Sequence, residues 1–302
     1  MKTIEIKLEQ QTPLLHFDPA KGATLRATEV KPKLDKYLTK KLPELNAFKI
    51  PDTNTLNYKM QITVPDSDKL LSLKDKLPMF PKIFSDSDSK LVSLSKKPIT
   101  IKLLIAGKLE DWIKSDNNKK LAKQIFFFFM KTNFGMRQTK GYGGFMVSSI
   151  CIDGISYDSE VSTWKERWTE EDCDCWYYCD NKALEEYNKA LEYVEKFHKY
   201  LNLKIKSVLD EINENEIARI VSPLTAKICK VDNGKYGIEI MPNEELIEKL
   251  EEKHIPPGKL MDFIENYDVC IVKALISAKF KKVELNEKKL GDIIKEIQES
   301  KK

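Results

Sequence analysis

The sequence predicts an α+β fold, and the order of strands and helices in its first half indicates a known type of domain. Short segments of alternating apolar and polar residues, typical of half-buried strands, are separated by two segments with helical periodicity. Their order is β-α-β-β-α-β, which is the order of a ferredoxin-like domain. A glycine-rich loop precedes the last of these strands, and a second, mostly helical α+β half follows.

Each element of the first half has its own signal. The first strand alternates Ile4, Ile6 and Leu8 with charged residues, and a loop from Thr12 to about Thr28 follows. Pro32 suits the first turn of a helix, because its missing N–H costs little there. The later elements are predicted as strands over residues 58–64 and 99–105, a helix over residues 117–133 and a strand over residues 145–152.

We expect residues 1–155 to form the ferredoxin-like domain and residues 156–302 to form the second half. A degenerate ferredoxin-like domain is one interpretation of this half. The segment Asp232-Asn233-Gly234-Lys235 predicts a hairpin turn between strands near residues 218–231 and 236–241. Helical patterns cover residues 181–203, 243–253, 257–267 and the segment after Asn286, with a strand-like stretch ending near residue 280.

The composition is that of a globular protein. Of 302 residues, 41% are hydrophobic and 32% are charged, so the chain can bury a sizeable core. No run approaches the roughly 20 apolar residues that a membrane span requires, and the first residues lack the apolar core of a signal peptide. We therefore expect a cytoplasmic protein without a membrane partner.

The charge is divided unevenly along the chain. Residues 1–150 contain 27 Lys and Arg against 15 Asp and Glu, which is a net +12, and the remainder contains 24 against 32, which is a net −8. A basic first half predicts an anionic partner. Because 47 of the 51 cations are lysine, a general bias toward lysine also explains part of this charge, and the four arginines are the more informative cations.

The most informative segment is the glycine-rich loop at residues 134–145. It holds four of the eleven glycines, together with Arg137 and Lys140. Glycine permits positive φ and a close approach of another backbone, and successive N–H groups in such a loop form a concave anion site. The two cations favour phosphate as the anion. A tight connection between a helix and a strand, with solvated cations, explains the loop equally well.

The segment from Gly135 to Phe145 resembles the pattern G-x-R-x-x-[KR]-G-x-G-[SG]-[FL] of the RAMP superfamily of CRISPR-associated RNA-binding proteins, in particular subunits of Cmr-type effector complexes. Earlier segments, Thr12-Pro13-Leu14 and Gly22-Ala23-Thr24-Leu25-Arg26, resemble the first loop and helix start of those subunits. Ser222-Pro223-Leu224 resembles a strand that opens the second half of several members. The chain departs from the family where Ala27, Thr28 and Glu29 replace the usual basic residues after Arg26.

The resemblance implies an RNA-binding subunit of a CRISPR ribonucleoprotein that contacts other effector subunits. Its partner would be single-stranded guide or target RNA, held by salt-dependent contacts to phosphate and by stacking of bases on aromatic rings. Tyr142 is the candidate ring, although a buried tyrosine is as good an interpretation. The predicted RNA-binding residues are Arg26, Lys31, Lys33, Gly135, Arg137, Lys140, Gly141, Tyr142, Gly143 and Gly144.

Two other functions remain open. In endonucleases of the same superfamily that process CRISPR RNA without a metal, a histidine in the first loop acts as general acid or base, and His16 is the candidate here. His16 lies between apolar residues, however, so a packed histidine is the simpler interpretation. The third function is a structural subunit that contacts only protein. His198 and His254 lie in charged helical segments and are predicted to be surface residues.

The sequence predicts no cofactor and no metal. Cys173, Cys175 and Cys179 lack the paired spacing and the nearby histidine of a structural zinc site, although Cys151, Cys229 or Asp180 could supply a fourth ligand. The chain has no phosphate-binding loop of the GxxxxGK[ST] type, no HExxH motif and no serine nucleophile elbow.

Overall fold

A computed structural model of the chain describes two compact units. The first unit contains Met1–Gln138 and Tyr142–Asp172, and the second contains Thr139–Gly141 and Cys173–Lys302. The described residues are 1–16, 24–51, 53, 55–65, 92–113, 115–167, 176–178, 190–191, 194–195, 224–230, 236–242 and 283–284.

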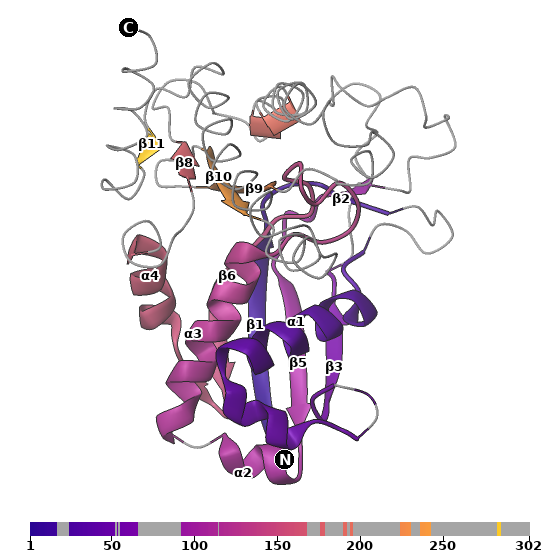
Figure 1. The fold of residues 1–302 in the computed structure, drawn as a ribbon, viewed down its shortest axis with the longest axis vertical. Coiled ribbons are helices and arrows are strands. Elements are labelled where there is room, and N and C mark those ends of the chain that lie inside the picture. Colours follow the sequence, from indigo (N-terminus) through magenta and orange to yellow (C-terminus); the bar gives the residue numbers. More distant parts are fainter. Residues whose placement is uncertain are drawn as a thin grey trace, which may run out of the picture. The chain divides into compact units, whose positions relative to one another are not determined.

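The first unit is built on a five-stranded antiparallel sheet in the order β3-β5-β1-β6-β7 (Figure 1). Helix α1 (Ala27–Lys41) connects β1 to β3, and α3 (Ser115–Lys131) connects β5 to β6. The α+β class is therefore confirmed, and the order of strands is compatible with the predicted ferredoxin-like arrangement. The strands are β1 (Lys2–Gln10), β3 (Tyr58–Thr63), β5 (Ile99–Ile105), β6 (Phe145–Ile152) and β7 (Ile155–Ser156).

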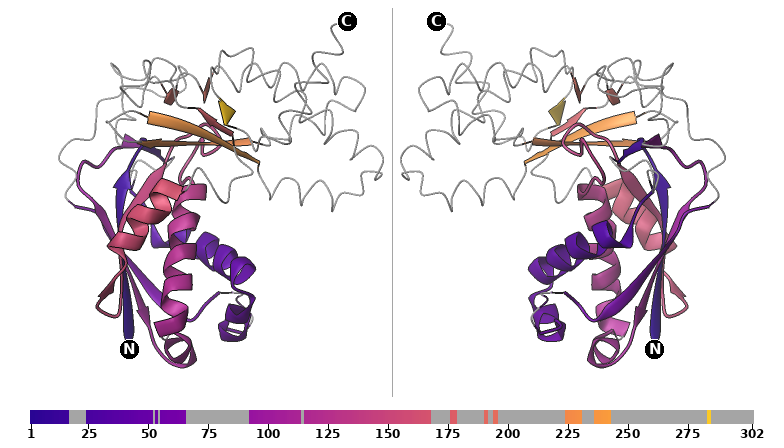
Figure 2. Two further views of the ribbon diagram at one scale, coloured as in Figure 1. Left: turned by 90° about the vertical axis from the view of Figure 1, so that its left-hand side faces the viewer. Right: turned by 90° about the vertical axis from the view of Figure 1, so that its right-hand side faces the viewer.

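The alternating pattern of the central strand explains which face of the sheet is covered. Ile4, Ile6 and Leu8 of β1 are buried, whereas Lys7 and Glu9, which follow Ile6 and Leu8, are exposed. Side chains alternate between the two faces of a strand, so the apolar set of β1 faces one side, and Figure 2 shows α1 and α3 together on one face of the sheet. The predicted strands over residues 99–105 and 145–152 are confirmed with the same bounds, and the strand predicted over residues 58–64 ends one residue earlier.

The phenylalanine run of α3 supplies much of the core. Phe126, Phe128 and Phe129 are fully buried, and Phe127 is nearly so. The ring centroids of Phe128 and Phe134 are 6.0 Å apart, and those of Phe134 and Phe145 are 5.8 Å apart. Aromatic pairs at these separations add to the stability gained from burial. The chain of rings fixes both ends of the glycine-rich loop, because Phe134 precedes it and Phe145 begins β6.

Helix α1 begins at Ala27, close to the predicted end of the preceding loop near Thr28, but Pro32, which was predicted in its first turn, lies beyond that turn. Arg26, with an extended backbone, precedes the helix, and Pro32 lies inside it. A proline within a helix removes one hydrogen bond to the carbonyl four residues before it, here that of Thr28. Thr28 and Pro32 are both exposed, so this carbonyl lies on the solvent side of the helix. The prediction was wrong because it took Pro32 as a marker of the first turn.

Several short elements were not predicted. Residues 14 and 15, expected in a loop, form β2 (Leu14–Leu15), which pairs with β4 (Val92–Ser93). Pro43–Phe48 forms a 3₁₀ helix, η1. Two further helices are α2 (Lys108–Trp112) and α4 (Asp158–Arg167).

The second unit contains a four-stranded sheet in the order β11-β8-β10-β9. The predicted hairpin is confirmed as the antiparallel pair β9 (Leu224–Lys230) and β10 (Tyr236–Pro242), although its turn at residues 231–235 lies outside the described residues. The other strands are β8 (Trp176–Tyr178) and β11 (Val283–Glu284).

Other predictions for the second half fall largely outside the described residues. Within the predicted helix at residues 181–203, residues 190–191 and 194–195 are helical. The features that lie outside the described residues are Cys173, Cys175, Cys179, His198, His254, the helices at residues 243–253 and 257–267, the strand-like stretch to residue 280 and the final helix. No group of three or more His, Cys, Asp or Glu side chains that could hold a metal occurs in the described part of the chain.

Among the helices that the structure describes, none has both the length and the apolar character needed to cross a bilayer.

Candidate nucleic-acid interface

The glycine loop, defined here as residues 134–144, packs along the Thr-Pro segment, residues 11–16. The N–H of Gly143 donates to the Pro13 carbonyl at 2.8 Å, and the N–H of Met136 donates to the Leu15 carbonyl at 2.9 Å. The N–H of Gly144 donates to Thr12 Oγ1, also at 2.8 Å. Two of the segments that carry the resemblance are therefore in direct contact in the first unit.

Two glycines of the loop are required by close approach of the backbone. At Gly135, with φ +75°, a Cβ atom would lie 2.4 Å from the carbonyl oxygen of Leu15. At Gly143, with φ +68°, it would lie 1.8 Å from the carbonyl oxygen of Phe134. Any side chain at these positions would force the backbone apart, so the glycines have a structural role within the protein.

The backbone N–H groups of three predicted glycines have partners inside the protein. Those of Gly143 and Gly144 bond to the Thr-Pro segment, and that of Gly135 donates to Glu29 Oε1 at 2.5 Å. These donors are already used, so any contact between the loop and an anion depends mainly on its side chains.

Arg137 has an unusual backbone conformation in this loop. Its φ is +53°, a left-handed value that is uncommon outside glycine. Its guanidinium lies 5.4 Å from the centre of the Tyr142 ring, and Tyr142 is only 2% exposed. The predicted stacking ring is therefore buried and supports a partly exposed arginine. Strained residues of this kind occur preferentially at functional sites.

Lys33 joins α1 to the base of the glycine loop. Its Nζ donates to Gln138 Oε1 at 2.8 Å and to the Asn133 carbonyl at 3.3 Å. Gln138 in turn donates through Nε2 to the Gly135 carbonyl. The main-chain carbonyl of Gln138 accepts from Asn133 Nδ2 at 2.7 Å. Helix α1 thus also contacts the glycine loop.

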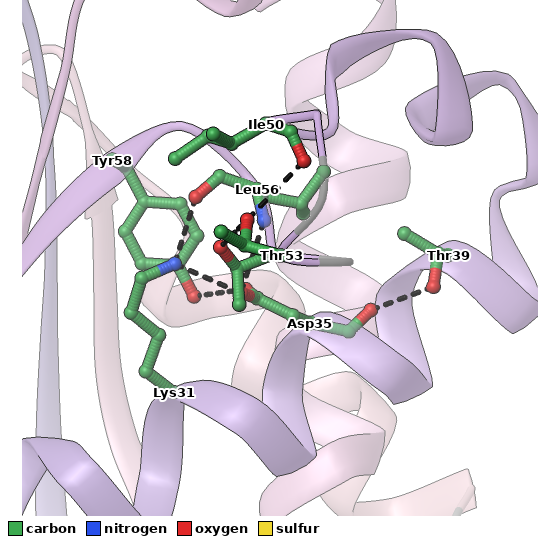
Figure 3. A network of polar contacts seen from close by, with 8 residues as sticks. Lys31, Asp35, Thr39, Ile50, Thr53, Leu56 and Tyr58 are labelled. Carbon is green, nitrogen blue, oxygen red and sulfur yellow. Dashed lines mark hydrogen bonds and ion pairs between the residues drawn. The ribbon is translucent and has the colours of Figure 1, made fainter.

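Lys31 lies in a different network, between α1 and β3 (Figure 3). Its Nζ donates to Asp35 Oδ2 and to the Leu56 carbonyl, both at 2.8 Å, and lies 3.7 Å from the centre of the Tyr58 ring. The Tyr58 hydroxyl donates to Asp35 Oδ1 at 2.6 Å, and the Leu56 N–H donates to Oδ2 at 3.1 Å. The carboxylate of Asp35 is buried, and these donors replace its lost hydration.

The environment of Tyr58 raises the pKa of its hydroxyl well above the ordinary value. Burial is the main cause, because it disfavours the phenolate, and the nearby negative charge of Asp35 adds to it. The hydroxyl therefore remains a donor to Asp35 over the physiological pH range.

Arg26, another of the predicted RNA-binding residues, precedes α1 and is partly exposed.

Lys140 and Gly141 belong to the second unit. The Ala226 N–H donates to the Thr139 carbonyl at 2.9 Å, so this part of the loop lies beside β9. Lys140 Nζ is 2.9 Å from Oε2 of Glu195, whose side chain is 8% exposed. A Cβ atom at Gly141 would lie 2.7 Å from Ile228 Cδ1. The two loop cations, Arg137 and Lys140, thus have different surroundings.

His16 is mostly buried beside the start of α1. Its Nε2 is 3.1 Å from the Thr24 carbonyl and 3.9 Å from Glu29 Oε2. The contact with a carbonyl fits an Nε2–H tautomer that donates within the protein.

The sequence did not reveal the roles of Glu29, Asn133 and Gln138. Glu29 lies three residues after Arg26, the position from which a glutamate commonly bonds back to the start of its own helix. In the structure it bonds instead to Gly135, more than 100 residues away. Neither spacing nor composition signals this contact.

The sequence also agrees with a known protein family. The profile of the family described as the Cmr1 N-terminal domain matches residues 1–205, which is more than half of the chain. Among curated proteins, none matches the sequence.

Proposed function

Because the chain belongs to the family of the Cmr1 N-terminal domain, we propose that it binds single-stranded guide or target RNA, with the glycine loop against the phosphate backbone. Membership in this family implies a subunit of a CRISPR effector complex. The observation that carries the proposal is Arg137, a partly exposed cation in a left-handed conformation over a buried tyrosine ring.

Arg137 and Arg26 are the proposed direct contacts to phosphate. A guanidinium offers forked donors that match two phosphate oxygens. Both arginines are partly exposed. Arg137 lies in the glycine loop, and Arg26 directly precedes α1, the helix that contacts this loop through Glu29 and Lys33. RNA offers phosphates whatever its sequence, so such contacts suit a protein that binds many guides or targets.

The other predicted residues take supporting roles in this proposal. Gly135, Gly143 and Gly144 allow the loop to approach the Thr-Pro segment, Tyr142 supports Arg137, and Lys33 holds the base of the loop. Lys31 and Lys140 already pair with Asp35 and Glu195. A phosphate contact by either lysine would compete with that ion pair.

The test is a salt titration of RNA binding by Arg137→Ala. Loss of one phosphate contact is expected to weaken binding about tenfold, which is about 1.4 kcal/mol, and to reduce the slope of log K against log salt by about 0.7. The matched control is Lys7→Ala, which removes an equal charge from an exposed position on β1. An unchanged slope in Arg137→Ala, or an equal change in both variants, would exclude the loop as the RNA site.

Cleavage of RNA by His16 is the alternative function. Its position between a carbonyl and a carboxylate favours a packed histidine, and we expect a labelled repeat RNA to remain intact when incubated with the protein and EDTA. Site-specific cleavage that disappears in His16→Ala would establish the endonuclease instead. A protein that neither binds nor cleaves RNA would be a structural subunit that contacts only protein.

A further inference from the structure

We propose that Glu29 is a positioning residue for RNA binding, which holds the glycine loop in the shape that presents Arg137. This inference rests on the proposed function. It has an unusual consequence: removing a negative charge close to the RNA site should weaken RNA binding.

The geometry begins at the first turn of α1. Glu29 is the third residue of the helix, and no side chain caps the helix at Arg26. The carboxylate is only partly exposed, and its Oε1 accepts the Gly135 N–H. The first turn of the helix therefore fixes the start of the glycine loop.

Lys33 completes the attachment one turn later. Its Nζ lies 3.8 Å from Glu29 Oε1 and donates to Gln138 and Asn133. Glu29 and Lys33, called the clasp below, thus supply an acceptor and a donor to opposite sides of one short turn. Arg137 lies between the two points of attachment, Gly135 and Gln138.

The clasp explains how Arg137 keeps a conformation that is unfavourable by itself. A left-handed backbone is disfavoured for a residue with a side chain, and such a residue persists only where its surroundings determine it. A hydrogen bond to a charged acceptor is among the stronger ones in proteins. Without Glu29, we expect the turn to relax and the Arg137 side chain to lose its fixed direction.

Electrostatics alone predicts the opposite result. Two unit charges about 10 Å apart in water interact strongly enough to change an affinity about twofold, so removal of an anion should tighten RNA binding by about that factor. Loss of the Arg137 contact should weaken it about tenfold. The sign of the change therefore distinguishes positioning from simple charge.

The experiment is a double-mutant cycle in the full chain, with the affinity for a labelled single-stranded RNA as the readout. Glu29→Ala should weaken binding about tenfold alone and cause no further loss when combined with Arg137→Ala, because both act through the same contact. Glu29→Gln retains an oxygen acceptor for Gly135 and should restore most of the affinity. The charge control is Glu44→Ala, an exposed position in η1, which should leave binding unchanged or slightly tighter.

A second variant covers the case in which Glu29→Ala does not fold. Gln138→Ala breaks the other side of the clasp without changing the charge, and it should weaken binding only when Arg137 is present. Tighter binding by Glu29→Ala, or a full loss added to that of Arg137→Ala, would overturn the inference. If Arg137→Ala itself has no effect, the proposed function fails first, so the two failures are distinct.

Discussion

At the scale of single residues, the structure separates two uses of glycine. Gly143 and Gly154 both have positive φ, so a side chain at either position strains the backbone. A Cβ atom at Gly143 would also overlap the Phe134 carbonyl, whereas at Gly154 nothing lies within 4 Å. Gly143 is thus required by close packing as well as by its positive φ, whereas Gly154 is required only by its positive φ.

The two glycines allow a matched test of this difference. Gly154→Ala should lower the free energy of unfolding by about 1 kcal/mol, the cost of a left-handed alanine. Gly143→Ala should lower it by about 3 kcal/mol or more, because the backbone must also move. Denaturant unfolding of both variants measures the difference, and equal losses would show that the contact with Phe134 is not limiting.

At the scale of elements, a buried polar network attaches α1 to β3. Asp35 is 1% exposed and accepts from Tyr58, Leu56 and Lys31, and its own carbonyl accepts from Thr39 Oγ1 at 2.8 Å. A network of this kind stabilises only when every member has a partner. Lys31 therefore contributes to the attachment of the helix that carries Glu29 and Lys33.

The raised pKa of Tyr58 makes this attachment sensitive to alkaline pH. The folded protein keeps the Tyr58 proton above the pH near 10 at which an unfolded chain loses it. The resulting stability is fully present below about pH 10 and is lost as pH rises through the higher pKa of the folded state.

We expect Tyr58→Phe to lower the free energy of unfolding by about 1 to 2 kcal/mol near neutral pH, because Asp35 loses a donor. The variant should also lose less stability than the unaltered protein between about pH 9 and about pH 11. Urea unfolding over that range measures both effects, and parallel pH profiles would contradict the proposed linkage.

At the scale of the whole molecule, net charge is distributed between a basic first half and an acidic second half. Several lysines of the basic half are engaged within the protein, as Lys31 and Lys33 show. Lys36, Lys40 and Lys41 of α1 are exposed, and we propose that their positive charge contributes to general attraction of RNA. Family membership implies a complex with other subunits.

The comparison of halves uses two triple variants with equal changes in charge. Replacement of Lys36, Lys40 and Lys41 by glutamine should weaken RNA binding more than the same replacement of Lys182, Lys189 and Lys196. At about 0.15 M salt the Debye length is about 8 Å, so distant charges are largely screened and local contacts dominate. Equal losses in a binding titration would show that the charge asymmetry has no bearing on where RNA binds.

The sequence determined the elements of the first unit because burial leaves a local periodicity. Alternation in β1 predicted a half-buried strand, and the order of elements then restricted the topology. The position of the glycine loop before β6 also followed from local pattern, as did its likeness to a family that the profile match confirms. The placement of Pro32 in the first turn of α1 was wrong, because this proline is tolerated further inside the helix on its exposed side.

Only the tertiary structure decided what the residues of the loop do. A cluster of glycines indicates that something approaches the backbone, but it does not say whether a ligand or another part of the chain approaches. Here Gly135 and Gly143 are approached by protein carbonyls, and Lys33 and Glu29 reach residues about 100 positions away. Such partners depend on how distant segments are brought together in space, and the local spacing of residue types does not indicate which segments these are.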